Sequence, residues 1–212
     1  MQVAVETNHA EADALAERLR ARRKEIGLTM QQVADRAGLS VGFISQIERG
    51  IAAPSLSSLV SVSRVLGLHV SDFLAQPVAD DPSTRHDKRP VYAVSENSVT
   101  YERLSSSFPG STLRSVIIHE PPGHRAEPIA HEGEEMLFVL GGGVTVEVGG
   151  DLTVLAEGDS IHFPSTKVHS TWNHTGEPAT ILWVGTMDVF GDQGHDESNP
   201  NLNGRTTTKR ND

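Results

Sequence analysis

The chain has 212 residues, of which 37% are hydrophobic and 22% are charged, so it is long enough for two small domains or one of medium size. It contains no cysteine, which excludes disulfides and thiolate metal sites. Its acidic start lacks an apolar signal segment, and no run approaches the roughly 18 apolar residues of a membrane span, so we expect a cytoplasmic protein with no membrane partner.

The net charge of −10 is unevenly distributed along the chain. Residues 14–75 contain eight basic and five acidic side chains, a net charge of +3, and the remainder carries −13. Contacts with phosphate need Lys and Arg only where a protein touches nucleic acid, so the acidic total does not exclude DNA binding. The asymmetry favours a DNA-binding head on an acidic body.

Apolar residues at helical spacing predict five helices in the N-terminal part of the chain. The first covers residues 12–26, and its inward positions are Leu15, Leu19 and Ile26. The second follows Thr29 as N-cap, with Gln32 as its capping-box partner, and ends at Gly38.

Three further helices follow at short intervals. Ser40 caps the third, over residues 41–49, which Gly50 ends. The fourth opens at Ser55, and its inward residues are Leu56, Leu59, Val60 and Leu66. A short fifth helix contains Val70, Phe73 and Leu74.

A change in composition separates this part from the rest of the chain. Residues 76–90 are rich in Pro, Asp and Ser and predict a linker. Beyond them lie short β-branched runs at the regular spacing of an all-β sandwich or barrel: TYERLSS, TLRSVIIHE, EMLFVL, VTVEV, LTVL, SIHFP, HSTWN and ATILWV. The predicted divisions are a helical domain over 12–75, the linker, a β domain over 91–190, and a disordered tail over 191–212.

The third predicted helix has the pattern of a DNA-reading helix. Placed at 100° per residue, it buries Ile44 and Ile47 and turns Gly42, Gln46 and Arg49 outward. Gln46 suits a bidentate pair with adenine, Val41 a contact with a thymine methyl, and Gly42 a close backbone approach. An ordinary helical bundle with a polar outer face has the same pattern, so periodicity alone leaves both interpretations open.

The run LTMQQVADRAGLSVGFISQIERGIAAPSLSSLVSVSRVLGLHVSDFL resembles the Xre-type, phage-repressor-like helix-turn-helix family over about sixty residues. The resemblance implies sequence-specific binding of a homodimer to pseudo-palindromic double-stranded DNA. It also implies that Glu48 orients Arg23 on the sugar-phosphate backbone, although a weak surface ion pair would look the same in sequence. The expected DNA-binding residues are Arg23, Thr29, Gln31, Gln32, Ser40, Val41, Gly42, Phe43, Ser45, Gln46 and Arg49.

The stretch from Ala130 to Val184 resembles the cupin superfamily, whose fold is a double-stranded β-helix, or jelly-roll barrel. Its second motif is matched by Gly158, Pro164, His169 and Asn173, with Thr166 in place of a glycine, and its first by His131, Glu135 and Gly141. Ile129 stands where the first motif has its first histidine. The chain is thus expected to be α+β, with an all-α domain followed by an all-β cupin.

Cupins hold a metal with three histidines and one glutamate, so the resemblance leaves His131, Glu135 and His169 as candidate ligands for Zn, Fe, Mn or Ni. Glu134 and His124 are candidate replacements for the missing ligand, and His162 and His174 are weaker ones. With or without metal, a small barrel can enclose one ligand. The expected effector pocket comprises His124, Arg125, His131, Glu135, His169 and Trp183.

The sequence does not show which of the candidate wall side chains point into the barrel. It also leaves open whether the effector is an anion or a cation. Arg114, Arg125, Trp172 and Trp183 are candidate wall residues, and the arginines would bind an anion. A cation would instead be attracted by Glu132, Glu134 and Glu135. The alternation in EMLFVL predicts that Glu135, Leu137 and Val139 point into the barrel.

The order of modules resembles a family of bacterial regulators of amine, amino-acid or sulfur metabolism. It implies a DNA-binding transcription regulator, not an enzyme, whose barrel binds an amine, an amino acid or a related small metabolite and modulates operator binding. Two alternatives remain: a bifunctional metal-dependent cupin enzyme, against which Ile129 argues, and a DNA-binding protein whose barrel serves only dimerisation.

Overall fold

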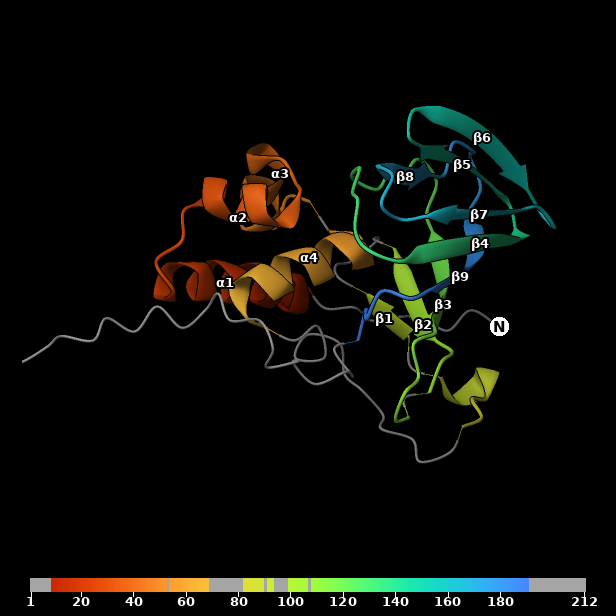
Figure 1. The fold of residues 1–212 in the computed structure, drawn as a ribbon, viewed down its shortest axis with the longest axis horizontal. Helices are drawn as coiled ribbons and strands as arrows, with labels where there is room; N and C mark the ends of the chain where they lie inside the picture. The colour runs from red at the N-terminus through yellow and green to blue at the C-terminus, as the bar shows by residue number, and fades with distance from the viewer. Residues whose placement is uncertain are drawn as a thin grey trace, which may run out of the picture.

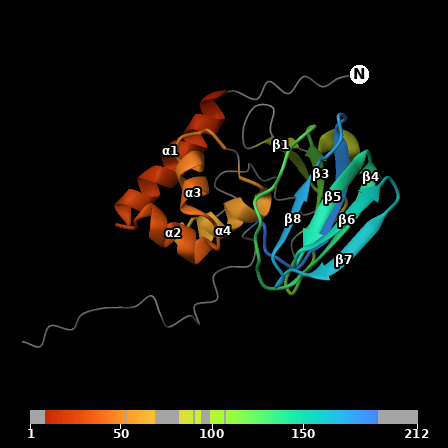
Figure 2. The ribbon, with the colours of Figure 1, turned by 90° about the horizontal axis from the view of Figure 1, so that it is seen from above.

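The protein forms two bodies that lie side by side, one of helices and one of strands (Figures 1 and 2). The computed structural model describes residues 9–52, 54–68, 82–89, 91–93, 99–106 and 108–190. We call the first body the helical domain (α1 to α4) and the second the barrel (β1 to β9). None of the helices in these ranges combines the length and the apolar character needed to cross a membrane.

The helical domain contains α1 (His9–Glu25), α2 (Met30–Ala37), α3 (Val41–Ile47) and α4 (Leu56–Leu66). Three of its helices begin at an N-cap side chain that accepts a backbone hydrogen bond, as predicted: Thr29, Ser40 and Ser55. Thr29 and Gln32 complete the predicted capping box. Gly38 ends α2 in the left-handed conformation, with φ of 69°, which glycine adopts without steric cost.

Some details of the predicted helices differ from the structure. Helix α1 ends at Glu25, so Ile26 lies in the following turn, where helical periodicity no longer applies, and is 37% exposed. Helix α3 ends at Ile47, because Glu48 is its C-cap. The predicted fifth helix with Val70, Phe73 and Leu74, and the predicted tail of residues 191–212, lie outside the described residues.

The helical domain is held by an apolar core and by one buried ion pair. Leu19, Val33, Ile44 and Leu59 are each no more than 2% exposed. Beside this core, two guanidinium nitrogens of Arg23 donate to the two carboxylate oxygens of Glu48, with an Nη2 to Oε2 distance of 2.7 Å. The side chains are 11% and 8% exposed, and the hydrogen bond to Glu48 raises the pKa of Arg23 above its ordinary value. This is a buried bidentate pair that ties α1 to the end of α3, not a weak surface contact.

The barrel consists of two antiparallel sheets. The larger has the strand order β1-β2-β3-β9-β4-β7 and the smaller β6-β5-β8. The strands are β1 (Val91–Ala93), β2 (Thr100–Arg103), β3 (Arg114–Glu120), β4 (Glu134–Gly141), β5 (Gly143–Val148), β6 (Asp151–Ala156), β7 (Ser160–Pro164), β8 (His169–Trp172) and β9 (Ala179–Gly185). Each of the eight runs named from sequence coincides with a strand, from β2 to β9. Strand β1 was not predicted, and a 3-10 helix (His86–Lys88) lies within the predicted linker.

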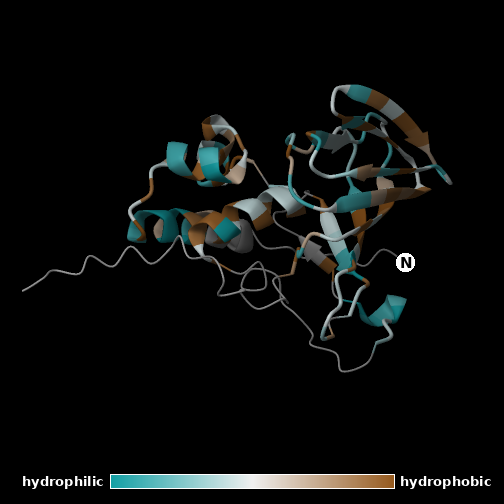
Figure 3. Ribbon diagram, viewed as in Figure 1, coloured by the Kyte–Doolittle hydropathy of each residue, from teal (hydrophilic) through white to brown (hydrophobic). Residues whose placement is uncertain are grey.

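Alternation along the strands decides which side chains enter the barrel. Glu135, Leu137 and Val139 of β4 are 4%, 2% and 0% exposed, which confirms the predicted inward face. The outer strand β6 instead leaves Leu152 and Val154 exposed, and hydrophobic residues are visible along it in Figure 3. The buried residues of the helical domain and the barrel form one continuous cluster, so the two bodies are in contact.

We expect Glu48→Ala to lower the free energy of unfolding of the helical domain by about 3 kcal/mol, because it leaves the Arg23 guanidinium buried without its carboxylate. Chemical denaturation followed by the circular dichroism of the helices measures this. Glu25→Ala is the matched control, because its ion pair with Arg22 has a carboxylate that is 68% exposed, and a change below about 0.5 kcal/mol is expected. Equal losses for the two variants would contradict the structural role of the buried pair.

Candidate functional site

The outer face of α3 is open to solvent. Val41 is 41% exposed, and Gly42, Gln46 and Arg49 are also exposed. The hydrogen bond and the cavity described below place the contact with the barrel at the start of α4 rather than at α3. The face that a DNA groove would receive is therefore not sealed by the barrel.

Other residues predicted to touch DNA flank this face. Gln31 and Gln32 are exposed on the first turn of α2, where the Gln31 amide donates to Asp35 and the Gln32 oxygen accepts from the Thr29 N–H. Ser40 is exposed and caps α3, and Ser45 is half-buried. Arg49 follows the end of α3 and donates to the Ser45 carbonyl at 3.1 Å.

Two residues of the predicted DNA-binding set expose little of their side chains. Phe43 is only 6% exposed, so its ring belongs to the helical core, and its inclusion among the DNA contacts was wrong. It is the third residue of α3, on the side that also carries Ile47, which is 2% exposed. Arg23 has an 11% exposed side chain, and its guanidinium is occupied by Glu48 and the Leu28 carbonyl.

A cavity of about 70 Å³ opens inside the barrel, several times the roughly 10–15 Å³ that one buried water needs. Its walls are largely apolar, and its polar groups include Glu120, His124, Glu135 and His169. Three of the four predicted pocket residues in this wall, Glu135, His169 and Trp183, are no more than 5% exposed, and the fourth is the half-buried His124. None of the described residues that line it is a lysine or an arginine.

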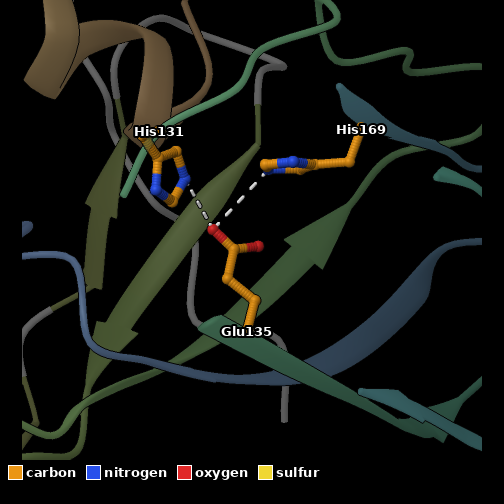
Figure 4. Close-up of side chains that lie close together, drawn as sticks. All are labelled: His131, Glu135 and His169. Carbon is orange, nitrogen blue, oxygen red and sulfur yellow. Dashed lines mark ion pairs between the residues drawn. The ribbon is translucent and has the colours of Figure 1, made fainter. Parts of the chain in front are cut away.

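At one end of this cavity, His131, Glu135 and His169 point toward one another (Figure 4). His131 precedes β4, Glu135 lies in β4 and His169 begins β8. One ligand atom from each lies within 4.8 Å of the other two. His131 Nε2 is 2.8 Å from Glu135 Oε1, and His169 Nε2 is 3.7 Å from the same oxygen.

The other ring nitrogens determine what this cluster can hold. His131 Nδ1 donates to the Glu132 carbonyl at 3.0 Å, and His169 Nδ1 donates to the Lys167 carbonyl at 2.9 Å. In a neutral imidazole this leaves the lone pair on Nε2, facing a carboxylate oxygen that also carries lone pairs. Apart from each other, neither His131 Nε2 nor Glu135 Oε1 has a hydrogen-bond partner in the described chain, so they can bond to each other only through a proton that one of them carries. A positive charge is needed between these atoms, supplied by a proton or by a cation.

The protonated form of the cluster follows from the same contacts. Burial opposes the charge of His131, but the hydrogen bonds to Glu135 and to the Glu132 carbonyl outweigh it and raise the pKa of His131. Burial also opposes the charge of Glu135, and the hydrogen bond from His131 with the nearby His169 lowers the pKa of Glu135. A divalent metal ion at the same point would replace this proton, as in sites where carbonyls fix the tautomer of ligand histidines. The three residues thus fit a metal, with Ile129, 3% exposed, beside His169 in place of a fourth ligand.

The remaining predicted wall residues and replacement ligands lie elsewhere. Arg125 stacks over the Trp172 ring at 4.5 Å and has a 62% exposed side chain, so its assignment to the pocket was wrong. Arg114 is fully buried and donates to Ser111 and Leu113 outside the cavity. Glu134 pairs with His162 on the surface at 3.0 Å, Glu132 is exposed, and His174 hydrogen-bonds Thr145. Asn173 of the second motif is structural, because its amide bridges the Glu120 and Glu177 carbonyls.

Glu120 is a cavity residue that the sequence analysis did not identify. It is 3% exposed, and its Oε1 accepts a hydrogen bond from the Thr171 hydroxyl at 3.2 Å, while Oε2 is buried without a hydrogen-bond partner among the described residues. Burial raises its pKa to about 7, despite the opposing hydrogen bond from Thr171. The signal was present in the alternation of β3, where Val116, Ile118 and Glu120 share the inward face.

Both parts of the chain match known protein families. Residues 19–73 match the family described as "Helix-turn-helix", and residues 116–185 match the family described as "Cupin domain". "HTH-type transcriptional regulator PuuR" of Escherichia coli is 27% identical over 170 residues, which are 79% of this chain and 92% of that protein. "HTH-type transcriptional regulator SutR" of Escherichia coli is 24% identical over 157 residues, 73% of this chain and 84% of the relative.

One solved structure extends the likeness to the arrangement of the fold. The crystal structure of an HTH_3 family transcriptional regulator from Vibrio cholerae has a TM-score of 0.53 and 24% identity. The match covers 84% of this chain and 97% of that one. At this identity the likeness concerns the fold alone, and it supports a helical domain followed by an antiparallel cupin barrel.

Between pH 5 and 7 we expect stability to fall as pH rises, because folded Glu120 keeps a proton that the unfolded chain releases near its ordinary pKa of 4.5. Glu120→Gln should flatten this profile and raise stability at pH 8, by up to about 3 kcal/mol for full burial of the charge. Thermal unfolding at fixed pH values measures both effects. Glu127→Gln controls for the loss of one negative charge at the cavity, and a wild-type profile that rises over this range would contradict the assignment.

Proposed function

We propose that this chain is an Xre-type helix-turn-helix transcription regulator with a C-terminal cupin domain, and that its barrel binds a small, positively charged effector that adjusts the affinity for an operator. The observation that carries this proposal is a largely apolar, partly open cavity with two buried carboxylates, Glu120 and Glu135, and no lysine or arginine among the described residues of its wall. A carboxylate in low dielectric is stabilised by a positive partner. An amine or an amino acid that presents its ammonium group fits this chemistry.

The cavity offers two positions for positive charge. At the first, His131, Glu135 and His169 would hold a divalent metal ion, which would fix those side chains and present further coordination positions toward the cavity. At the second, the unpartnered oxygen of Glu120 would accept a hydrogen bond from the ammonium group of the effector. The role proposed for the barrel is binding rather than turnover.

The helical domain is the part proposed to bind DNA. We assign base recognition to the exposed face of α3, with Gln46 as the principal reader, and phosphate contacts to Gln31 and Gln32 at the start of α2. Domains of this kind read two half-sites as a two-fold dimer, so the proposed DNA-binding species is a homodimer on a pseudo-palindromic operator. Metal analysis and unbiased identification of small molecules that copurify with the full chain test the sensor role most directly.

For the metal position, we expect titration of metal-free protein with Zn²⁺ to give about one tight site per chain, with release of protons as His131 gives up its charge. His169→Ala should abolish this site, and Ile129→His should tighten it about tenfold or more by adding a fourth ligand. His162→Ala is the control, because His162 also faces a glutamate but lies on the surface. Stoichiometric binding that survives His169→Ala would place the ion elsewhere.

For DNA reading, Gln46→Ala should relax the base preference at one position of each half-site and cost about 1–3 kcal/mol on the preferred sequence. Selection from a random duplex pool, followed by fluorescence anisotropy, measures preference and affinity. Gln31→Ala is the contrasting variant, because loss of a phosphate contact should weaken all sequences equally. A uniform loss for Gln46→Ala would make Gln46 a phosphate contact instead.

A further inference from the structure

The cavity of the barrel is not formed by the barrel alone. Ser55, Leu56 and Ser57, which are the N-cap and first two residues of α4, line it together with residues of β3, β4, β8 and β9. Figures 1 and 2 show α4 directed at the barrel with its N-terminal end. A ligand in this cavity would therefore touch the domain that carries the DNA-reading helix.

A buried hydrogen bond holds this end of α4 in place. The backbone N–H of Leu56 donates to the hydroxyl of Tyr101, with a distance of 3.1 Å, between residues 45 positions apart in the chain. The N–H groups of the first turn have no acceptor within their own helix, so Tyr101 of β2 satisfies a group that would otherwise be costly to bury. Both residues are nearly buried, with Leu56 6% and Tyr101 3% exposed.

Charge links this contact to the carboxylates of the cavity. The N-terminal end of α4 carries the positive end of the helix dipole and faces a space that contains Glu120 and Glu135. The second oxygen of Glu120 is buried and without a partner in the described chain, which marks the position that a ligand would fill.

We propose that the cavity is an effector site shared by the two domains, in which a cationic ligand and the first turn of α4 compete for the same carboxylates. This proposal rests on the proposed function and adds how ligand binding in the cavity reaches the helical domain. A cation beside Glu120 offsets the negative charge that this carboxylate carries when it is ionised, and the cation itself repels the positive end of the helix. Occupancy therefore releases the helical domain from the barrel and changes the placement of α3, and by linkage operator binding changes effector affinity by the same factor.

The docking of α4 on the barrel can be measured in ligand-free protein with pairs of introduced cysteines. The chain contains no cysteine of its own, so only the introduced thiols react. Ser57→Cys and Glu127→Cys place one thiol on α4 and one on the barrel, both at the wall of the cavity, for cross-linking by a bismaleimide. Arg36→Cys, exposed on α2, combined with Glu127→Cys reports random encounters. We expect efficient cross-linking of the first pair in the full-length protein and little of the second.

The next comparison tests the hydrogen bond. Tyr101→Phe is added to the protein that carries Ser57→Cys and Glu127→Cys. It should shift the docking equilibrium about fivefold toward release and lower the cross-linking yield, because it removes the acceptor of the Leu56 N–H. Thr145→Val removes a different barrel hydroxyl, bonded to His174 outside the cavity, and should leave the yield unchanged. A yield unaffected by Tyr101→Phe would overturn the proposed docking.

The last comparison joins docking to function, with n-butylammonium as the probe and 1-butanol and butyrate as neutral and anionic analogues. The amine should lower the cross-linking yield. It should also shift operator affinity in the same direction as Tyr101→Phe does without ligand. In protein that is already cross-linked, the amine should leave operator affinity unchanged. If the amine binds but leaves yield and operator affinity unchanged, the shared site is refuted and the binding role stands. If neither the amine nor an analogue binds, the proposed effector class fails, while the ligand-free comparison still decides the docking.

Discussion

A backbone N–H group at the start of α4 donates a hydrogen bond to the barrel, and the contact between the helical domain and the barrel depends on this bond. The amide of Leu56 cannot be satisfied within its own helix, and Tyr101 supplies a hydroxyl from β2 at 3.1 Å. Because the contact is buried, release of the helix must replace a satisfied donor by a solvated one. The first turn of α4 thereby becomes one wall of the cavity in the barrel.

The two buried carboxylates of that cavity are in different electrostatic states. Glu135 has the imidazoles of His131 and His169 beside it, which favour its ionised form. Within the described part of the chain the Glu120 carboxylate has one hydrogen bond, from Thr171, so burial dominates and its pKa rises to about 7. The same apolar wall that makes an isolated carboxylate unfavourable would make a cationic partner favourable, and the proposed preference for a cationic effector rests on this.

Much of the fold could be predicted because its signals are local. The N-caps Thr29, Ser40 and Ser55 mark helix starts through hydrogen bonds that span three residues, and two-residue alternation located β2 to β9. The metal-ligand candidates were found through motif spacing, and the structure brings all three together. Errors occurred where burial depends on the neighbouring element: Phe43 is in the helical core, and Arg125 stacks on the outside of the barrel.

The sequence by itself determined the two-part architecture, the orientation of Gln46 on α3, and the residues of the histidine and glutamate cluster, because each depends on contacts or periodicities within a short segment. Only the tertiary structure decided that Ser57 lies at the wall of the barrel cavity and that Glu120 shares this cavity with Glu135. These placements join residues far apart in the chain through the packing of one domain on another. No periodicity within a segment records where its ends will dock.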